Sequence, residues 1–230
     1  MISLDTPPRS TPSDYPSIDR IKWFRKQLSA WGVANRRDYP WRKTTDSYHL
    51  LVAESLLQKT DADTVAPIYE LFLEHYPTIQ DLATADLDDV AKILKPLGLF
   101  FRAERLQQCA QIVIRQHNGK VPQDQKQLLK LPGIGDYTAR AIGSQAFNQP
   151  LAVLDANVAR ILERFFGLQG ERVKSRCKIL WGAADLIAPK TKVGTWNLAL
   201  LDFGALVCKA QNPDCDRCPL SLKCKWYNRN

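Results

Sequence analysis

Apolar residues recur every three or four positions through almost the whole chain after its first 17 residues, and no other feature restricts the fold as much. Ile21, Phe24, Leu28 and Trp31 show this spacing, which places them on one face of a helix that Gly32 is predicted to end. No segment alternates apolar and polar residues as a half-buried strand would, and no repeat array is present. The 230 residues therefore predict an all-α protein of about ten short helices.

Short local signals place several helix boundaries. Thr78 and Asp81 have the spacing of a capping box, which opens a helix, and Pro77 stops the helix before it. The segment "FRAERLQQCAQIVIRQHNG" continues the helical spacing to Gly119. Further helices are predicted for residues 47–58, 65–76, 155–166, 173–187 and 195–207, and another begins near Asp136.

Composition narrows the class of protein. With 45% hydrophobic and 24% charged residues, the chain can build one large domain or two smaller ones. No apolar run approaches the ~18 residues of a membrane helix, and residues 1–17, rich in Pro, Ser and Thr, are predicted to be a disordered leader without a secretory signal. We therefore expect a cytoplasmic, nucleoid-associated protein with no membrane partner.

The charge of the chain points to the kind of partner. A net charge of +8 and a pI near 9.2 favour a polyanion, nucleic acid in particular. A basic soluble protein without such a partner is the alternative. Charge alone does not separate the two, so the motifs of the chain have to identify the partner.

The stretch "LPGIGDYTARAIG", residues 131–143, joins two predicted helices by a tight turn. Gly133 and Gly135 carry no Cβ, so another molecule can approach the backbone there closely. The helix that follows directs its free N–H groups at the same place, which suits a phosphate group. An ordinary helix–helix turn is the alternative, and the carboxylate of Asp136 disfavours a phosphate.

Four of the six cysteines crowd the C-terminal end, which in a reducing compartment favours a metal centre over disulfides. A single close C-x2-C pair differs from the two matched pairs of most zinc modules, so the uneven spacing favours a [4Fe–4S] cluster. Zinc and four unrelated thiols are the alternatives. The predicted ligands are Cys208, Cys215, Cys218 and Cys224.

Two acidic residues stand in apolar surroundings. Asp155 lies where an apolar run becomes a helix, so it is either an N-cap or a carboxylate that faces a cleft. Glu54 has apolar neighbours on both sides, so it lies on a polar stripe of its helix or is half-buried with a raised pKa, ready to donate a proton. The scattered histidines do not suggest a hydrolytic triad.

These features together resemble a known family. The hairpin "LPGIGDYTARAI", Asp155 eighteen positions after Tyr137, and the C-x6-C-x2-C-x5-C ending are similar to the endonuclease III superfamily of helix-hairpin-helix DNA glycosylases. The likeness runs from about Trp23 to Cys224. The stretches "YPWR", "ESLLQKT" and "WNLALLDFGALVC" resemble its adenine and thymine/uracil mismatch branches, and the mismatch-specific thymine glycosylases most of all.

The resemblance implies a domain organisation. A six-helix barrel that carries the hairpin would cover residues 40–149. Residues 18–39 and 150–230 would form a discontinuous helical domain closed by the [4Fe–4S] loop. Double-stranded DNA with a mismatched or damaged base would bind a monomer in the cleft between the two domains.

The resemblance also implies how DNA is held. The hairpin would present backbone amides to a phosphate, Gln58 would fill the space that an extruded base leaves, and Leu99 would form a wedge beside the orphaned base with help from Phe100. Extruding a base costs a few kcal/mol, and an inserted side chain offsets part of this cost. The implied DNA-binding residues are Gln58, Leu99, Phe100, Leu131, Gly133, Gly135 and Thr138.

Three residues are implied to be catalytic. Family members that cut the strand carry a lysine at the position of Tyr137, and a tyrosine cannot form a Schiff base, so we expect a monofunctional glycosylase. Asp155 would stabilise the oxocarbenium-like sugar and position water, and Glu54 would protonate the leaving base. Tyr137 would line the pocket, unless it only fills the wall between the domains.

The expected reaction is hydrolytic removal of thymine or uracil opposite guanine. An adenine glycosylase that acts opposite guanine or 8-oxoguanine is the alternative, and a non-catalytic DNA-structure-binding protein is the alternative from another class. Tyr137 favours the thymine branch, since the adenine branch typically has a small serine there. The sequence ends six residues after Cys224, so we also expect no further domain that reads oxidised guanine.

Overall fold

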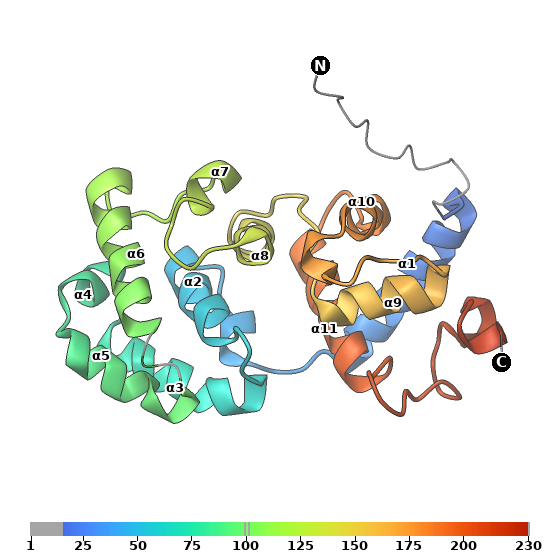
Figure 1. The fold of residues 1–230 in the computed structure, drawn as a ribbon, viewed down its shortest axis with the longest axis horizontal. Coiled ribbons are helices and arrows are strands. Elements are labelled where there is room, and N and C mark those ends of the chain that lie inside the picture. The colour runs from blue at the N-terminus through green and yellow to red at the C-terminus, as the bar shows by residue number, and fades with distance from the viewer. Residues whose placement is uncertain (1–15, 99, 101, 230) are drawn as a thin grey trace, which may run out of the picture.

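The computed structural model describes residues 16–98, 100 and 102–229, and this part of the chain is helical without a strand. The all-α prediction is therefore confirmed. None of the helices is long and apolar enough to cross a bilayer within these residues. The α-helices are α1 (Ile18–Asn35), α2 (Ser47–Leu56), α3 (Ala62–His75), α4 (Ile79–Thr84), α5 (Leu87–Leu94), α6 (Arg102–His117), α7 (Gln125–Leu128), α8 (Asp136–Ala146), α9 (Ala156–Phe166), α10 (Lys178–Ile187) and α11 (Val193–Leu206) (Figure 1).

Aspartate side chains open many of these helices. Five helices begin after an aspartate whose carboxylate accepts hydrogen bonds from first-turn N–H groups, which have no acceptor within their own helix. The capping box at Thr78 and Asp81 is also confirmed. Local sequence thus defines most helix starts. The five capping residues are Asp46, Asp61, Asp86, Asp124 and Asp155.

Two predicted boundaries are wrong. Helix α1 does not end at Gly32 but continues to Asn35. A Cβ on Gly32 would lie 2.7 Å from the Cβ of Ala199 on α11, so this glycine allows two helices to pack closely. Helix α10 begins at Lys178 instead of residue 173, because a 3-10 turn, Lys174–Arg176, precedes it.

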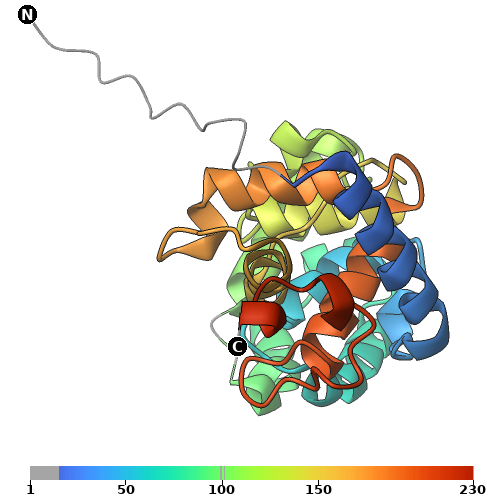
Figure 2. The same ribbon diagram turned by 90° about the vertical axis from the view of Figure 1, so that its right-hand side faces the viewer.

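The helices enclose two hydrophobic cores. The first core lies among α2 to α7 and one side of α8, with Leu51 and Phe72 at its centre. The second core lies among α1, α9, α10 and α11, where the Phe24 and Phe165 rings are 4.7 Å apart. Figures 1 and 2 show α1 beside α9 and α11, although these helices come from opposite ends of the chain. The second core is therefore built from segments that are distant in sequence.

A buried ion cluster fastens the segment between α1 and α2 to α11. Asp202 is 0% exposed, and its carboxylate accepts hydrogen bonds from Arg37 Nε at 2.6 Å and from Arg42 Nη1 at 2.5 Å and Nη2 at 2.8 Å. Burial alone would raise the pKa of Asp202, but the hydrogen bonds from Arg42 and Arg37 outweigh it and lower the pKa. Because removing one partner of a buried pair leaves a charge without compensation, this cluster is important for the fold.

The contact between α8 and α11 gives a test of the packing. A Cβ on Gly194 would lie 2.8 Å from the carbonyl oxygen of Ser144, a backbone atom in the last turn of α8. We expect Gly194→Ala to lower the free energy of unfolding by about 1–3 kcal/mol, measured by thermal or chemical denaturation. Its exposed neighbour provides the control, because Thr195→Ala should change stability by no more than about 0.5 kcal/mol. Equal stability of the two variants would contradict the packing.

Candidate functional site

The hairpin between α7 and α8 presents bare backbone. Gly133 has φ +81°, a left-handed conformation that favours glycine, and both Gly133 and Gly135 are exposed. No described atom lies within 4 Å of the position that a Cβ would take on either glycine. No side chain caps the N-terminal end of helix α8. The backbone carbonyl of its N-cap residue, Gly135, accepts a hydrogen bond from Ala139 N at 2.9 Å. The amides of its first turn therefore face open space, as a phosphate site requires.

The other predicted DNA-binding residues differ in how exposed they are and in whether they contact this hairpin. Gln58 is half-buried and donates a hydrogen bond from Nε2 to the carbonyl of Gly133 at 3.1 Å. Phe100 is 61% exposed. The side chains of Leu131 and Thr138 are buried, so only their backbone can meet a ligand. Leu99 lies outside the described residues.

Glu54 is a buried acid on α2. It is 7% exposed, and burial raises its pKa to about 8, with a further contribution from the nearby charge of Asp155. A hydrogen bond with Gln145 and the charge of Arg42 act in the opposite direction but do not outweigh burial. Glu54 is therefore mostly protonated near neutral pH and can donate a proton.

Tyr137 lies on the first turn of α8, half-buried against the second core. Burial raises the pKa of its hydroxyl well above the ordinary value, and the charges of Glu54 and Asp155 raise it further. The three predicted catalytic residues therefore interact electrostatically, although they come from α2, α8 and the start of α9. Tyr137 remains a neutral phenol at any pH at which the reaction would run.

Asp155 is the N-cap of α9, as one of the two alternatives from the sequence predicted. As the N-cap of α9 it accepts a hydrogen bond from Val158 N at 2.7 Å with Oδ1, and Oδ2 accepts one from Asn157 Nδ2 at 2.8 Å. Burial nevertheless raises the pKa of this carboxyl, against the effect of these bonds. The capping bond fixes the carboxylate at the position where it interacts with Tyr137.

A chain of hydrogen bonds continues from Asp155 to the C-terminal loop. Asn157 accepts a hydrogen bond at Oδ1 from Arg160 Nη2 at 2.7 Å. The same arginine donates from Nε to the carbonyl of Cys208 at 2.7 Å and from Nη2 to that of Gly204 at 2.8 Å. The backbone of one predicted metal ligand is thus connected to Asp155 through two side chains.

Sequence reasoning missed three residues of this site: Arg42, Gln145 and Asn157. Arg42 stands in the "YPWR" stretch, so a motif signal was present, but its buried contact with Asp202 was not visible. Asn157 follows the N-cap by two positions and could have been considered for that reason. Nothing local indicates Gln145, because its hydrogen bond to Glu54 joins two different helices.

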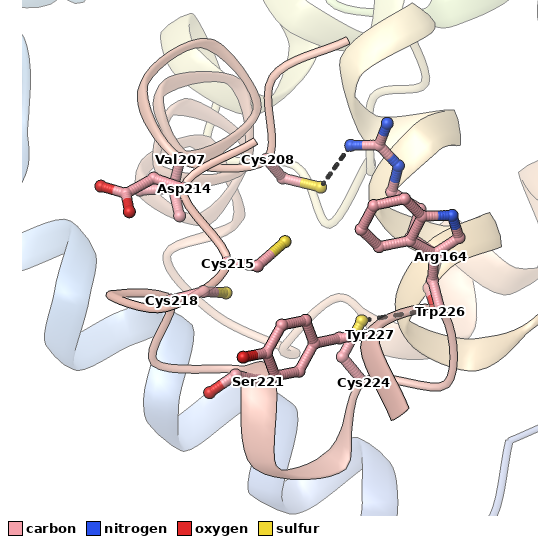
Figure 3. Close-up of a pocket in the computed structure, with 10 residues that line it drawn as sticks. All are labelled: Arg164, Val207, Cys208, Asp214, Cys215, Cys218, Ser221, Cys224, Trp226 and Tyr227. Atoms are coloured by element: carbon pink, nitrogen blue, oxygen red, sulfur yellow. Dashed lines mark hydrogen bonds between the residues drawn. The ribbon is translucent and has the colours of Figure 1, made fainter. Parts of the chain in front are cut away.

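The four C-terminal cysteines come together around one cavity. Cys208 follows α11, Cys215 and Cys218 lie in the next loop, and Cys224 follows the 3-10 turn Ser221–Lys223. All four thiols are free, and their sulfur atoms point into the cavity (Figure 3). Beside them, Arg164 donates from Nη1 to Cys208 Sγ at 3.6 Å.

The arrangement of the thiols fits an iron–sulfur cluster. Burial raises the pKa of Cys218 to about 11, and it also raises that of Cys215, with contributions from the neighbouring thiolates. Four thiolates at one place need a cationic centre to balance their charge, and a cluster of irons supplies one.

Family comparisons agree with both parts of the site. Residues 52–183 match the HhH-GPD superfamily base excision DNA repair protein, and residues 208–221 match the iron-sulfur binding domain of endonuclease III. The second match spans three of the four cysteines, with Cys224 beyond its end. It confirms the predicted [4Fe–4S] cofactor.

Individual relatives extend the match over most of the chain. A thymine/uracil-DNA glycosylase of Methanothermobacter thermautotrophicus is 38% identical over 203 residues, 88% of this chain and 91% of the relative. An adenine DNA glycosylase of Rattus norvegicus is 35% identical over 225 residues, but this chain spans only 44% of that relative's length. Both are named DNA glycosylases, and the predicted enzyme class, a DNA N-glycosylase, is confirmed.

Solved structures give the same result for the fold. A thermostable thymine-DNA glycosylase superposes with a TM-score of 0.88 at 36% identity, over 92% of this chain and 98% of its own. A non-covalent endonuclease III–DNA complex superposes with a TM-score of 0.80 at 25% identity, over 93% and 98%. The chain therefore belongs to the HhH-GPD superfamily of base excision DNA repair proteins.

Proposed function

We propose that this protein is a monofunctional glycosylase that removes thymine or uracil opposite guanine by hydrolysis of the N-glycosidic bond. The observation that carries the proposal is the pair of acids, Glu54 and Asp155, that interact electrostatically with Tyr137 and with each other. One of them, Glu54, is protonated near neutral pH, and the other, Asp155, holds its carboxylate at a helix start. Tyr137, whose pKa is strongly raised, stands at the position where strand-cutting family members carry the amine of a lysine.

In this mechanism Glu54 acts on the leaving base and Asp155 acts on the sugar and the attacking water. Glu54 donates its proton to the pyrimidine as the bond from C1′ to the base nitrogen breaks. The carboxylate of Asp155 stabilises the positive charge that develops on the sugar, and it accepts a proton from the water that attacks C1′. The products are the free base and an intact strand with an abasic site.

The proposed grip on DNA is the hairpin. The open first turn of α8 and the bare glycines receive a backbone phosphate, which holds the duplex without reading its sequence. Gln58 fills the space that the extruded base leaves, and the exposed Phe100 supports the wedge beside the orphaned base. The iron–sulfur loop, with its Cys ligands, holds the C-terminal segment and takes no part in the steps above.

An adenine glycosylase is the second candidate. Adenine DNA glycosylases of 35% identity are among the relatives, and a buried protonated carboxyl would also serve to protonate adenine. The thymine and uracil assignment is preferred because Tyr137 stands where the adenine branch typically has a small serine, and because the thymine/uracil-DNA glycosylase relative is 38% identical against 35% for the adenine DNA glycosylase.

The substrate is tested by base release under single-turnover conditions. Duplexes of identical sequence carry T·G, U·G, A·G or A opposite 8-oxoguanine, each analysed with and without alkali. We expect release of thymine and uracil, strand breaks only after alkali, and no covalent adduct when borohydride is added during turnover. Faster adenine release would favour the second candidate, and a trapped adduct would show that another amine replaces the missing lysine.

The hairpin is tested by changing the residue before α8. Gly135→Ser adds a capping hydroxyl, which binds the same first-turn amides as the phosphate does. We expect DNA affinity to fall by about tenfold at fixed ionic strength, with thermal stability unchanged or raised. Asp136→Asn should have the opposite effect, because it removes an exposed negative charge beside the phosphate. If both variants bind like the wild type, the phosphate does not lie at this turn.

The raised pKa of Glu54 predicts how activity and stability depend on pH. Since the acid must be protonated, the single-turnover rate should fall about tenfold per pH unit above pH 8. Because the folded pKa exceeds the unfolded one, ionisation destabilises the fold progressively between pH 4.5 and about 8. Glu54→Gln should therefore raise the melting temperature more at pH 9 than at pH 5, and an equal change at both would contradict the buried acid.

A further inference from the structure

The proposed reaction needs a fixed distance between residues that belong to different parts of the fold. Tyr137 is on α8, which contacts α2 of the first core and α11 of the second. Asp155 starts α9 and follows the extended segment 151–154. Whatever holds α8 against that segment therefore sets the separation of Tyr137 and Asp155.

Two side chains join α8 to this segment. The buried Asn197 of α11 donates from Nδ2 to Ser144 Oγ at 3.1 Å and to the carbonyl of Leu151 at 2.9 Å, and its Oδ1 accepts from Val153 N at 3.2 Å.

Arg140 is the second link, and it is nearer in sequence to Tyr137. Arg140 lies three residues after Tyr137 on α8, and its Nη1 donates to the carbonyl of Ala152 at 3.0 Å, three residues before Asp155. Its fork also binds the carboxylate of Asp185 on α10, with Nη1 to Oδ1 at 2.7 Å and Nη2 to Oδ2 at 3.1 Å. The guanidinium lies 4.7 Å from the centre of the Trp181 ring on the same helix. Arg140 thus connects α8, the segment before Asp155 and α10.

These contacts restrict orientation more than they add stability. The side chains of Arg140 and Asp185 are 17% and 45% exposed, and exposed ion pairs contribute little to folding. A planar guanidinium with two parallel bonds and a ring beneath it, however, permits only a narrow range of positions. The ring itself is fixed, because Trp181 donates from Nε1 to the carbonyl of Ser175 at 3.0 Å.

We propose that Arg140 is a positioning residue that holds Asp155 in place relative to Tyr137 and the rest of α8, so that the carboxylate of Asp155 meets the reacting sugar. The inference rests on the proposed base excision at this site, but not on which base is removed. A displacement of about 1 Å between reacting groups can cost on the order of 10² in rate. The loss of this clamp should therefore slow the chemical step far more than it weakens DNA binding.

The test compares two arginines that bind the same helix. Arg140→Lys keeps the positive charge but cannot make the two parallel hydrogen bonds of the guanidinium to Asp185. Arg25→Lys is the matched control. Among the described residues, the side-chain hydrogen bonds of Arg25 on α1 go to the carbonyls at the C-terminal end of α10 and just beyond it, at Leu186, Ile187 and Ala188, and not to α8. Three quantities are measured for each variant: the single-turnover rate on the best duplex, the dissociation constant for a non-hydrolysable 2′-fluoro duplex, and the melting temperature.

We expect Arg140→Lys to lower the rate roughly ten- to hundredfold, with the dissociation constant within about threefold of wild type. Arg25→Lys should lower the melting temperature at least as much and leave the rate unchanged. Asp185→Asn should slow the reaction too, and the double variant with Arg140→Lys should lose less than the sum of the two effects. A rate loss that follows melting temperature in both arginine variants would reduce Arg140 to a structural residue. A rise in the dissociation constant equal to the rate loss would make it a DNA contact.

A measurement without substrate separates this inference from the proposed function. Hydrogen exchange of residues 136–155 in the free protein should increase in Arg140→Lys and not in Arg25→Lys, because only the first variant loses a hydrogen bond between α8 and the segment before Asp155. If the wild type releases no base from any duplex, the proposed function fails, yet this difference in exchange is still expected. Equal exchange in the two variants would overturn the clamp whatever the activity.

Discussion

Helix α8 packs against both hydrophobic cores, with Ile142 in the first and Ala141 in the second. Each functional group near it depends on this position. Its N-terminal end presents the open amides of the hairpin, its first turn carries Tyr137, and its last turn lies against Gly194 of α11. Since protein interiors are close-packed, α8 cannot shift without disturbing the two cores together. The position of one helix thus fixes the phosphate site relative to the catalytic residues.

Two buried acids, Glu54 and Asp202, show how the partners of a carboxyl group decide its charge state. Glu54 and Asp202 both lose almost all contact with water, which favours the neutral form. Asp202 accepts hydrogen bonds from two arginines and has a lowered pKa, whereas Glu54 has an amide partner and a more distant cation and has a pKa of about 8. The same arginine, Arg42, contributes to both. One acid therefore fastens the fold as an anion, and the other keeps a proton that it can donate.

The C-terminal loop is held in place by hydrogen bonds and cysteine ligands, whereas the helices are held by the two hydrophobic cores. Among the described side chains after Cys208, only Leu220 is buried, so a hydrophobic core contributes little there. Arg164 of α9 binds the carbonyls of Lys209 at 2.7 Å and Ala210 at 3.1 Å, and its own carbonyl accepts from Trp226 N at 2.9 Å. The iron–sulfur cluster completes this set of contacts, because bonds from four thiolates to one centre stabilise a loop that could not bury enough apolar surface.

The sequence by itself determined the helical class, the hairpin and the metal ligands, because each is encoded by residues close together in the chain. Spacing of three and four defines a helix face, aspartates define helix starts, and four cysteines within seventeen residues define a metal loop. Packing between distant segments depends instead on which side chains meet in the folded protein, and these cannot be read from neighbouring residues. Gly32, predicted to end a helix, instead lets α1 approach Ala199. Only the tertiary structure brought Glu54, Tyr137 and Asp155 into one site and gave Glu54 its proton, because burial and charge at a point depend on every segment that packs around it.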